Sequence, residues 1–252
     1  MKVEAVIWDI YGTILYSVNM DTPVDPGKYL KFKKGFQRVG EFVNLEIDPD
    51  TGEKLYRNLV KELQKRKKKK NENIISPEIN IIKLWDIFMK KKFQKNFRRA
   101  TLEKIAIIFE KAVNPVEIGK NVEKILNYIR SKNLYQGIMS NAQFYTKRIL
   151  NDFLERSFDY YFNSDLVLFS YQIGVSKPDP QIYELLEKKL NYLSVKNKNC
   201  LIIGNDEDND IIPLSKRGFK SIYISPKGKD SSFSSYSFQN IDGVLAFLKK
   251  II

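Results

Sequence analysis

The sequence contains no histidine. This absence excludes Ser-His-Asp and Cys-His nucleophile schemes, and it excludes zinc sites built from imidazole ligands. Any acid–base chemistry must therefore come from aspartate, glutamate, lysine or tyrosine side chains.

Cysteine and long apolar segments are also scarce. A single cysteine, Cys200, excludes an intramolecular disulfide and a metal site made of several thiolates. No apolar run approaches the ~18 residues that a membrane-spanning helix needs. Residues 1–10 are too short and too acidic for a signal peptide. We therefore expect a soluble, cytoplasmic protein with no membrane partner.

Apolar strands and amphipathic helices alternate along most of the chain. Residues 3–8 are typical of a short buried strand, and the alternation continues after residue 114. It predicts an α/β fold with a doubly wound, parallel, Rossmann-like sheet that helices cover on both faces. Beyond residue 114 the sequence predicts strands at 134–139, 160–162, 201–203 and 221–224, and helices at 117–131, 143–154, 179–190, 208–216 and 242–250.

Residues 26–113 show a different pattern, because their apolar residues recur three and four positions apart, as in helices. Pro49 and Pro77 each follow a residue that can cap a helix, so both are expected just inside helix starts. The chain is therefore expected to form an α/β core interrupted by a helical segment. The predicted boundaries are residues 1–19 and 114–252 for the core, and 20–113 for the helical segment.

Polar residues follow several of the predicted strands. Sites in parallel sheets form beyond the carboxyl ends of the strands, so these residues are expected to lie close together. Lys177 is expected to add a cation there, because the adjacent Pro178 fits the first turn of a helix. The candidates are Asp9 after the first strand, Ser140 and Asn141 after the second, and Asn205, Asp206 and Asp210 after a later strand.

Four fragments resemble the motifs of the haloacid dehalogenase-like (HAD) hydrolase superfamily. They read DIYGTI (9–14), MSNA (139–142), VSKPDPQIY (175–183) and IIGNDEDNDI (202–211). They stand in the superfamily's order, each at a predicted strand or helix end, and they span nearly the whole chain. The resemblance implies a HAD-type core, and the helical segment between the first two motifs resembles the superfamily's cap domain.

The resemblance also implies catalytic roles. Asp9 would be the nucleophile and would form a covalent aspartyl intermediate. Lys177 would neutralise charge between this nucleophile and the substrate. Asp210 would take a proton from the water that hydrolyses the intermediate. The implied partner is a small anionic substrate.

Substrate binding is implied for four further positions. Ser140 and the main-chain amides around Tyr11 and Asn141 would hold the anionic oxygens of the substrate. Thr13 would steady the loop that carries Asp9. Taken singly, such residues are also typical of caps and solvated charges, but their order along the chain favours a site.

Tyr11 departs from the phosphatases of the superfamily, which usually have a second aspartate at this position to protonate the leaving oxygen. A phenol with a pKa of about 10 is a poor base at neutral pH, and an alkoxide leaves slowly without an acid. A halide needs no proton, and an acyl-phosphate leaving group needs little help. Because the dehalogenases also read Asp-x-Tyr-Gly-Thr, Tyr11 favours a 2-halo acid or an acyl phosphate as substrate.

Asn205 is a second departure, because the fourth motif usually begins Gly-Asp and this aspartate binds magnesium in the phosphatases. An amide oxygen can ligate Mg²⁺, but without formal charge the site is weaker. A magnesium site made of Asp9, the Tyr11 carbonyl, Asn205 and Asp206 stays open. A dehalogenase-like enzyme would need no cofactor.

Three functions therefore remain open. The first is a hydrolase with a leaving group that needs little acid assistance. The second is a magnesium-dependent phosphatase with a modified metal site. The third is a HAD scaffold that has lost efficient turnover and serves as a binding module. The dehalogenase resemblance is incomplete, since those enzymes carry serine and asparagine at the positions of Asn205 and Glu207.

Positive charge is concentrated in the helical segment. Residues 61–70 carry seven bases and one acid, and residues 90–99 carry six bases and no acid, in a chain of net charge +13. Such blocks are usually solvated, and Phe93 and Phe97 fit a cap interior as well as base stacking. We expect no nucleic-acid partner, and the positive field would attract anionic substrates. No particular oligomer is indicated.

Overall fold

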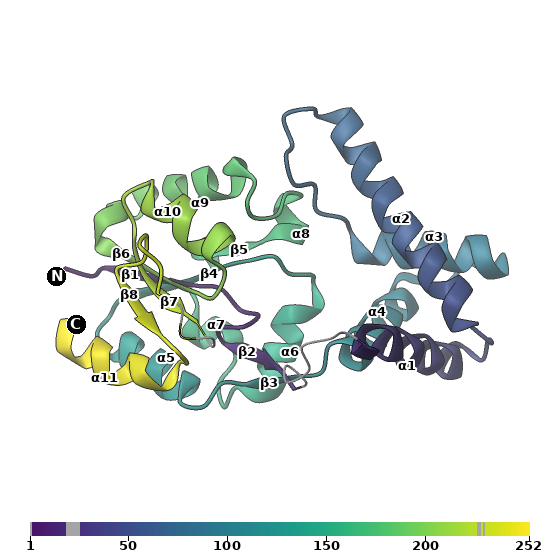
Figure 1. The fold of residues 1–252 in the computed structure, drawn as a ribbon, viewed down its shortest axis with the longest axis horizontal. Helices are drawn as coiled ribbons and strands as arrows, with labels where there is room; N and C mark the ends of the chain where they lie inside the picture. Colours follow the sequence, from purple (N-terminus) through teal and green to yellow (C-terminus); the bar gives the residue numbers. More distant parts are fainter. Residues whose placement is uncertain (1, 19–25, 226–227, 229) are drawn as a thin grey trace. The chain divides into compact units, whose positions relative to one another are not determined.

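Figure 1 shows the computed structural model, which describes residues 2–18, 26–225, 228 and 230–252. The chain divides into two compact units. The core unit comprises Met1–Tyr16 and Glu117–Ile252, and the insertion comprises Ser17–Val116. The boundary predicted between residues 113 and 114 lies three residues from the observed one. The boundary predicted between residues 19 and 20 falls outside the described residues.

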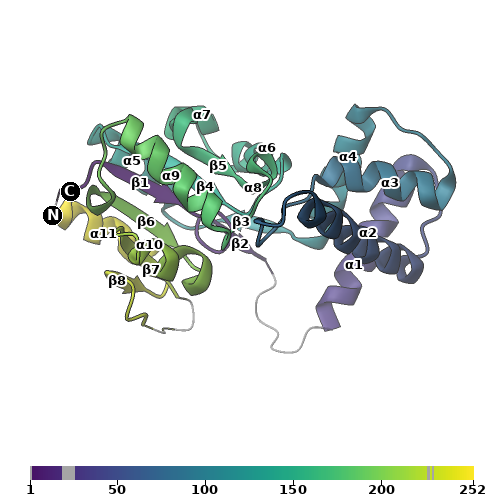
Figure 2. The same ribbon diagram turned by 90° about the horizontal axis from the view of Figure 1, so that it is seen from above.

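Six described strands of the core unit form one parallel sheet in the order β5-β4-β1-β6-β7-β8. β1 lies between β4 and β6, as Figure 2 also shows. All four of its residues are buried, which explains why a continuous apolar run marks this strand. The predicted α/β, doubly wound sheet is confirmed. The strands are β1 (Ala5–Trp8), β4 (Tyr135–Ser140), β5 (Val167–Phe169), β6 (Cys200–Gly204), β7 (Lys220–Ile224) and β8 (Tyr236–Phe238).

Helices cover both faces of this sheet, with α5 and α11 on one face and α9 and α10 on the other (Figure 1). α5 buries Val122, Ile125, Leu126 and Ile129, the spacing of a helix with one apolar face. The helices of the core unit are α5 (Val122–Ser131), α6 (Tyr145–Phe153), α7 (Phe158–Tyr161), α8 (Ser170–Ile173), α9 (Pro180–Tyr192), α10 (Ile212–Ser215) and α11 (Asp242–Ile251).

Three local predictions for the core unit are wrong. The helix predicted at 117–131 begins only at Val122, because Val116–Ile118 form the short strand β3. The strand predicted at 160–162 is instead the end of helix α7, and the edge strand is β5. The reason is spacing, because Phe158 and Tyr161 are buried three positions apart, as in a helix. Pro178 does not occupy the first turn of α9. Pro180 does, and Asp179 caps the helix by accepting a hydrogen bond from the Gln181 amide at 3.1 Å.

The insertion consists of helices around an aromatic cluster. Phe36, Trp85 and Phe109 pack with ring centroids 5.0 Å apart for both the Phe36–Phe109 and the Trp85–Phe109 pairs. None of the described helices of the chain is both long and apolar enough to cross a membrane. The helices of the insertion are α1 (Pro26–Val43), α2 (Pro49–Lys70), α3 (Ile81–Phe93) and α4 (Arg99–Val113).

The helix starts of the insertion test two capping predictions. Pro49 begins α2 as expected, behind a capping aspartate. The prediction for Pro77 is wrong, because α3 begins only at Ile81. Asn80 caps α3 by accepting hydrogen bonds from the amides of Ile82 and Lys83 at 3.0 and 3.1 Å.

The two ends of the insertion lie side by side. A short strand before it, β2 (Leu15–Ser17), pairs with a short strand after it, β3 (Val116–Ile118). Within the insertion, Ser17 Oγ donates to Asn114 Oδ1 at 2.9 Å. The Val18 amide donates to the main-chain carbonyl of Pro115 at 3.0 Å.

Candidate active site

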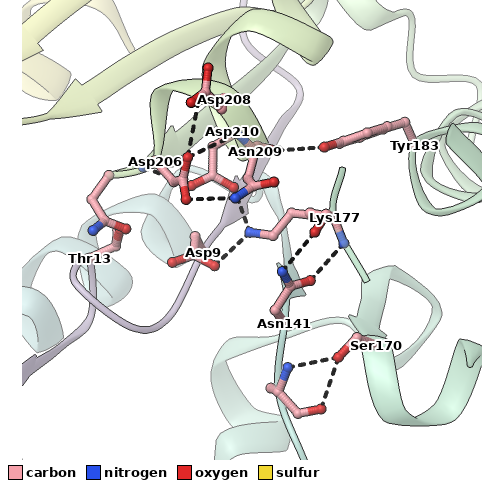
Figure 3. Close-up of polar contacts among 12 residues, drawn as sticks. Asp9, Thr13, Asn141, Ser170, Lys177, Tyr183, Asp206, Asp208, Asn209 and Asp210 are labelled. Atoms are coloured by element: carbon pink, nitrogen blue, oxygen red, sulfur yellow. Dashed lines mark hydrogen bonds and ion pairs between the residues drawn. The ribbon is translucent and has the colours of Figure 1, made fainter. Parts of the chain in front are cut away.

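Lys177 lies between two carboxylates in the core unit (Figure 3). Its Nζ donates to Asp9 Oδ1 at 2.7 Å and to Asp210 Oδ1 at 2.5 Å. The exposed fractions of the three side chains are 3% for Lys177, 9% for Asp9 and 1% for Asp210. Because buried charges persist only when they are paired and hydrogen-bonded, the three side chains form one ionic cluster.

Local backbone features bring the two carboxylates together. Asp9 follows β1, and its amide donates to the Ile203 carbonyl of β6 at 2.9 Å, which extends the ladder between the two strands. Asp210 lies in a π-helical turn that follows β6. A Cβ at Gly204 would lie 2.5 Å from Asp210 Oδ2, so glycine is required for this carboxylate to pack against the end of β6.

The cluster holds two carboxylates against one ammonium, and burial acts together with this imbalance to shift the pKa values of Asp210 and Lys177. Burial raises the pKa of Asp210, and the neighbouring charge of Asp9 adds to this rise, while Lys177 offsets only part of it. Burial alone would lower the pKa of Lys177, but the two carboxylates outweigh burial and raise that pKa. Lys177 therefore stays protonated at neutral pH, while Asp210 is a stronger base than an ordinary carboxylate.

Asn141 fixes the main chain of Lys177 through two reciprocal hydrogen bonds. Its Nδ2 donates to the Lys177 carbonyl at 3.0 Å, and its Oδ1 accepts from the Lys177 amide at 2.7 Å. The next residue, Ala142, is held in the same way by Ser170, whose Oγ accepts from the Ala142 amide at 2.9 Å and donates to its carbonyl at 3.2 Å. The side chain of Asn141 thus positions Lys177, and a substrate-binding role for its amide stays a prediction.

Ser140 is the last residue of β4 and is buried. Because Trp8 of β1 pairs with Ile138 of β4, Ser140 lies at the same edge of the sheet as Asp9. The role of Ser140 in binding anionic oxygens stays a prediction.

The loop after Asp9 packs against Asn205. Gly12 has a φ of +86°, and a Cβ there would lie 2.1 Å from Asn205 Nδ2, so both the backbone conformation and the close approach require glycine. The buried Thr13 donates from Oγ1 to Asn205 Oδ1 at 3.4 Å. The side chain of Asn205 therefore contacts the loop that carries the candidate nucleophile.

Residues 3–216 match the model of the haloacid dehalogenase-like hydrolase family. The chain belongs to this family. It is a HAD-superfamily hydrolase, and the four sequence fragments that resemble the family's motifs all lie within the matched range.

Solved structures of both dehalogenases and phosphatases share this fold. A 2-haloacid dehalogenase from Pseudomonas syringae pv. Tomato DC3000 aligns with a TM-score of 0.65 and 15% identity, over 99% of this chain and 100% of that one. A HAD phosphatase from Thermococcus onnurineus aligns with a TM-score of 0.57 and 18% identity, over 100% of this chain and 97% of that one. At these identities the likeness concerns the fold and does not separate the two activities.

A curated relative matches a shorter stretch. The Rhythmically expressed gene 2 protein of Drosophila melanogaster is 30% identical over 63 residues. The match covers 25% of this chain and 24% of that protein, so the chain spans about a quarter of the relative's length.

Tyr11 occupies the position that carries the leaving-group acid in the family's phosphatases. Its phenol and the hydroxyl of Thr146 share a hydrogen bond of 3.0 Å. Thr146 lies in the first turn of α6 and is fully buried beside the buried Ile149 and Leu150. Thr146 was not predicted from the sequence. A polar residue on the apolar face of a helix indicates a buried hydroxyl, but it does not identify the partner of that hydroxyl.

The turn after β6 uses its acidic side chains to stabilise itself. Asp206 Oδ1 accepts from the amides of Asp208 and Asn209, both at 3.0 Å, and its Oδ2 accepts from Asn209 Nδ2 at 2.6 Å. The Asn209 carbonyl in turn accepts a hydrogen bond from the hydroxyl of Tyr183 at 2.7 Å (Figure 3). Tyr183 is a second residue whose role was not recognised from the sequence.

These contacts do not fit the magnesium site that the sequence left open. Lys177 binds one oxygen each of Asp9 and Asp210, Asp206 caps its own turn, and Asn205 supplies only a neutral oxygen. In the described part of the chain, no three Asp, Glu or Cys side chains are grouped so that they could hold a metal ion. Mg²⁺ demands oxygen ligands in near-octahedral geometry. The donors that are not already engaged here also offer it little negative charge.

Proposed function

We propose that this HAD-superfamily hydrolase acts on a small anionic substrate whose leaving group departs with little acid assistance, either a 2-halo acid or an acyl phosphate. The observation that carries the proposal is the hydrogen bond between Tyr11 and Thr146. The side chain at the position of the usual acid is a weak acid that is already engaged by a buried hydroxyl. A substrate that releases a halide or a carboxylate suits such a site.

The first step uses Asp9 as the nucleophile. With a 2-halo acid, Asp9 Oδ2 attacks the halogen-bearing carbon, a carbon–oxygen bond forms, and the halide leaves with the electrons of the carbon–halogen bond. Lys177 contacts the other oxygen, Oδ1, at 2.7 Å and leaves Oδ2 for the attack. With an acyl phosphate, the same oxygen attacks phosphorus, and the substrate's carboxylate leaves.

The second step uses Asp210 as the base. Its raised pKa makes it a better proton acceptor than an ordinary carboxylate. It takes a proton from a water molecule that attacks Cγ of the Asp9 ester. The bond between Cγ and the ester oxygen then breaks, and the departing alkoxide oxygen takes the proton back from Asp210 to give the 2-hydroxy acid. One water oxygen stays on Asp9, whose carboxyl group loses its proton to solvent. The phospho-aspartate formed from an acyl phosphate is instead attacked at phosphorus.

Turnover in oxygen-18 water tests the proposal and separates the two substrate classes. We expect the peptide that contains Asp9 to gain the label during turnover of 2-chloropropanoate. During turnover of acetyl phosphate we expect the label in the released phosphate. Both activities should persist in the presence of a chelator and disappear in Asp9→Asn, while Lys147→Gln, a surface control, should retain them.

Three results would overturn the proposal. Full activity of Asp9→Asn would remove the nucleophile. Hydrolysis of p-nitrophenyl phosphate that a chelator abolishes, without turnover of either proposed substrate, would favour the magnesium-dependent phosphatase. Tight binding of anions without any turnover would favour a binding module.

A further inference from the structure

A basic groove runs along the C-terminal half of α2 in the insertion. It has a volume of about 680 Å³, within the range of about 300–1,000 Å³ typical of small-molecule sites. The segment 71–80 runs back from the end of α2 to the start of α3 (Figure 1). Its last three residues, 78–80, line the groove opposite α2 and form its second wall. Lys67 ties the walls together, since its Nζ donates to the Glu78 carbonyl at 2.9 Å. The groove is lined by Leu63, Arg66, Lys67, Lys69, Lys70, Glu78, Ile79, Asn80 and Lys83.

Positive charge dominates this groove. Five of its lining residues are cations, and Glu78 is the only acid among them. The carboxylate of Glu78 is engaged, because its Oε1 accepts a hydrogen bond from the Ile79 amide at 2.8 Å. In the part of the chain that the structure describes, no acid forms an ion pair with the exposed Lys69, Lys70 or Lys83. Arg66 pairs with Glu62 one turn earlier on α2. Lys69, Lys70 and Lys83 therefore supply the groove's positive charge that no neighbouring acid neutralises among the described residues.

Lys83 shows that helix electrostatics does not account for this arrangement. Cations in the last turn of α2 are favoured by the helix dipole, which explains Lys69 and Lys70 in part. Lys83 lies in the first turn of α3, where the dipole disfavours a cation, and that turn contains no acidic residue. Both helices thus direct positive charge into one groove at an electrostatic cost that a bound anion would offset.

The remaining lysines of α2 provide an internal comparison. Four of the α2 residues that line the groove follow helical spacing along one face, at positions 63, 66, 67 and 70, and Lys69 also lines it. Lys61, Lys65 and Lys68 are exposed on the same helix but do not line the groove. The basic sequence therefore divides into groove-lining cations and outward-facing cations.

We propose that this groove binds an oligophosphate, that is, a ligand with two or more adjacent phosphate groups. Lys69 and Lys70 of α2 and Lys83 of α3 contact the phosphates as donors. Arg66 donates to Glu62 and has further guanidinium N–H groups that suit a phosphate. Leu63 and Ile79 add apolar surface that a nucleobase can cover. The ligand is a nucleoside triphosphate or inorganic oligophosphate. The proposal concerns the insertion alone and does not depend on the proposed function of the core unit.

Calorimetric titration of the full-length protein with tripolyphosphate, ATP and orthophosphate tests this site. We expect tripolyphosphate and ATP to bind, orthophosphate to bind much more weakly, and affinity to fall between about 50 and 200 mM KCl. The triple variant Lys69→Gln, Lys70→Gln, Lys83→Gln should weaken binding by about tenfold to a hundredfold, because three charged contacts are lost. The control triple Lys61→Gln, Lys65→Gln, Lys68→Gln has the same net charge and should change affinity by no more than about threefold.

Comparison of the affinities for ATP and tripolyphosphate also identifies which class of ligand supplies the phosphates. Tighter binding of ATP than of tripolyphosphate would assign the apolar wall to a nucleobase, and equal affinity would assign the groove to inorganic oligophosphate. Equal weakening by both triple variants would overturn the proposal in favour of diffuse surface charge. Absence of tripolyphosphate binding, or tighter binding of a single-stranded oligonucleotide that both triples weaken, would also overturn it.

Discussion

At the scale of single residues, Lys177 determines whether Asp9 and Asp210 can both remain buried. We predict that Lys177→Met lowers the free energy of unfolding by about 3–5 kcal/mol, because it leaves two buried carboxylates without their cation. Adding Asp210→Asn should recover part of this loss, since it removes one of the two charges. Urea unfolding followed by circular dichroism measures both effects.

A surface lysine supplies the control for Lys177. Lys147 pairs with Asp159 at 2.7 Å, but the exposed fractions of these side chains are 41% and 63%. Lys147→Met should therefore cost only about 0–1 kcal/mol. Equal losses in the two methionine variants, or no recovery in the double variant, would contradict the ionic cluster.

The raised pKa of Asp210 predicts the direction of a pH effect. As a base, Asp210 must be ionised, so hydrolysis of the intermediate should slow as pH falls through this pKa. The slowing should begin well above the usual carboxyl range of about 4. Single-turnover rates across pH measure it. Asp210→Asn should abolish this pH dependence and accumulate the covalent adduct on the Asp9 peptide. A hydrolysis rate that stays constant down to a pH of about 4 would rule out Asp210 as the base.

The sequence located the motif residues but not their supporting contacts. Asp9, Lys177 and Asp210 could be expected near one another because strand ends in a parallel sheet share one edge. Thr146 could not, since its contact with Tyr11 joins positions 135 residues apart and follows only from the packing of α6. Partners of single buried polar groups depend on tertiary structure that no local pattern encodes.

At the scale of elements, Gly12 links the loop after β1 to the residue that follows β6. We predict that Gly12→Ala costs about 1–3 kcal/mol of stability, because it combines a positive φ with a clash against Asn205. Gly218→Ala is the control, since Gly218 has a similar φ of +80° but a Cβ there would have no neighbouring atom within 4 Å. It should cost only about 1 kcal/mol, from the strain of the positive φ alone.

Thermal unfolding of these glycine variants distinguishes backbone strain from the steric clash with Asn205 as the cause of the lost stability. Adding Asn205→Ala to Gly12→Ala should restore part of the lost stability, because it removes the clashing atoms. Equal losses for Gly12→Ala and Gly218→Ala would show that the backbone conformation alone matters.

Element boundaries were predictable where one local signal dominated. Pro49 and its capping residue set the start of α2 as expected. At α3, Pro77 was misleading, because the helix begins where Asn80 can cap two amides. The helix α7 was mistaken for a strand, since a short aromatic run is compatible with either structure until its packing is known.

At the scale of the whole molecule, each unit has its own hydrophobic core. Phe36 is fully buried in the insertion and packs against Phe88 and Phe109 at 5.7 and 5.0 Å between ring centroids. Phe36→Ala should cost about 3–5 kcal/mol, and the loss should be confined to the insertion. Hydrogen exchange measured by mass spectrometry should show lost protection in residues 31–113 and unchanged protection in the core unit.

The matched variant is Phe158→Ala, which removes a buried ring from the core unit. It should deprotect the core unit and leave the insertion protected. If either variant deprotects both units equally, the two units unfold as one cooperative structure.

The paired ends of the insertion have a consequence for the evolution of the chain. Contacts of Ser17 and Val18 with residues 114 and 115 close the insertion at its base, whatever the length of chain between them. A recombination event at this base can replace the whole insertion without altering the strand that leads to Asp9. Catalytic chemistry and ligand preference can therefore descend from different ancestors within one chain.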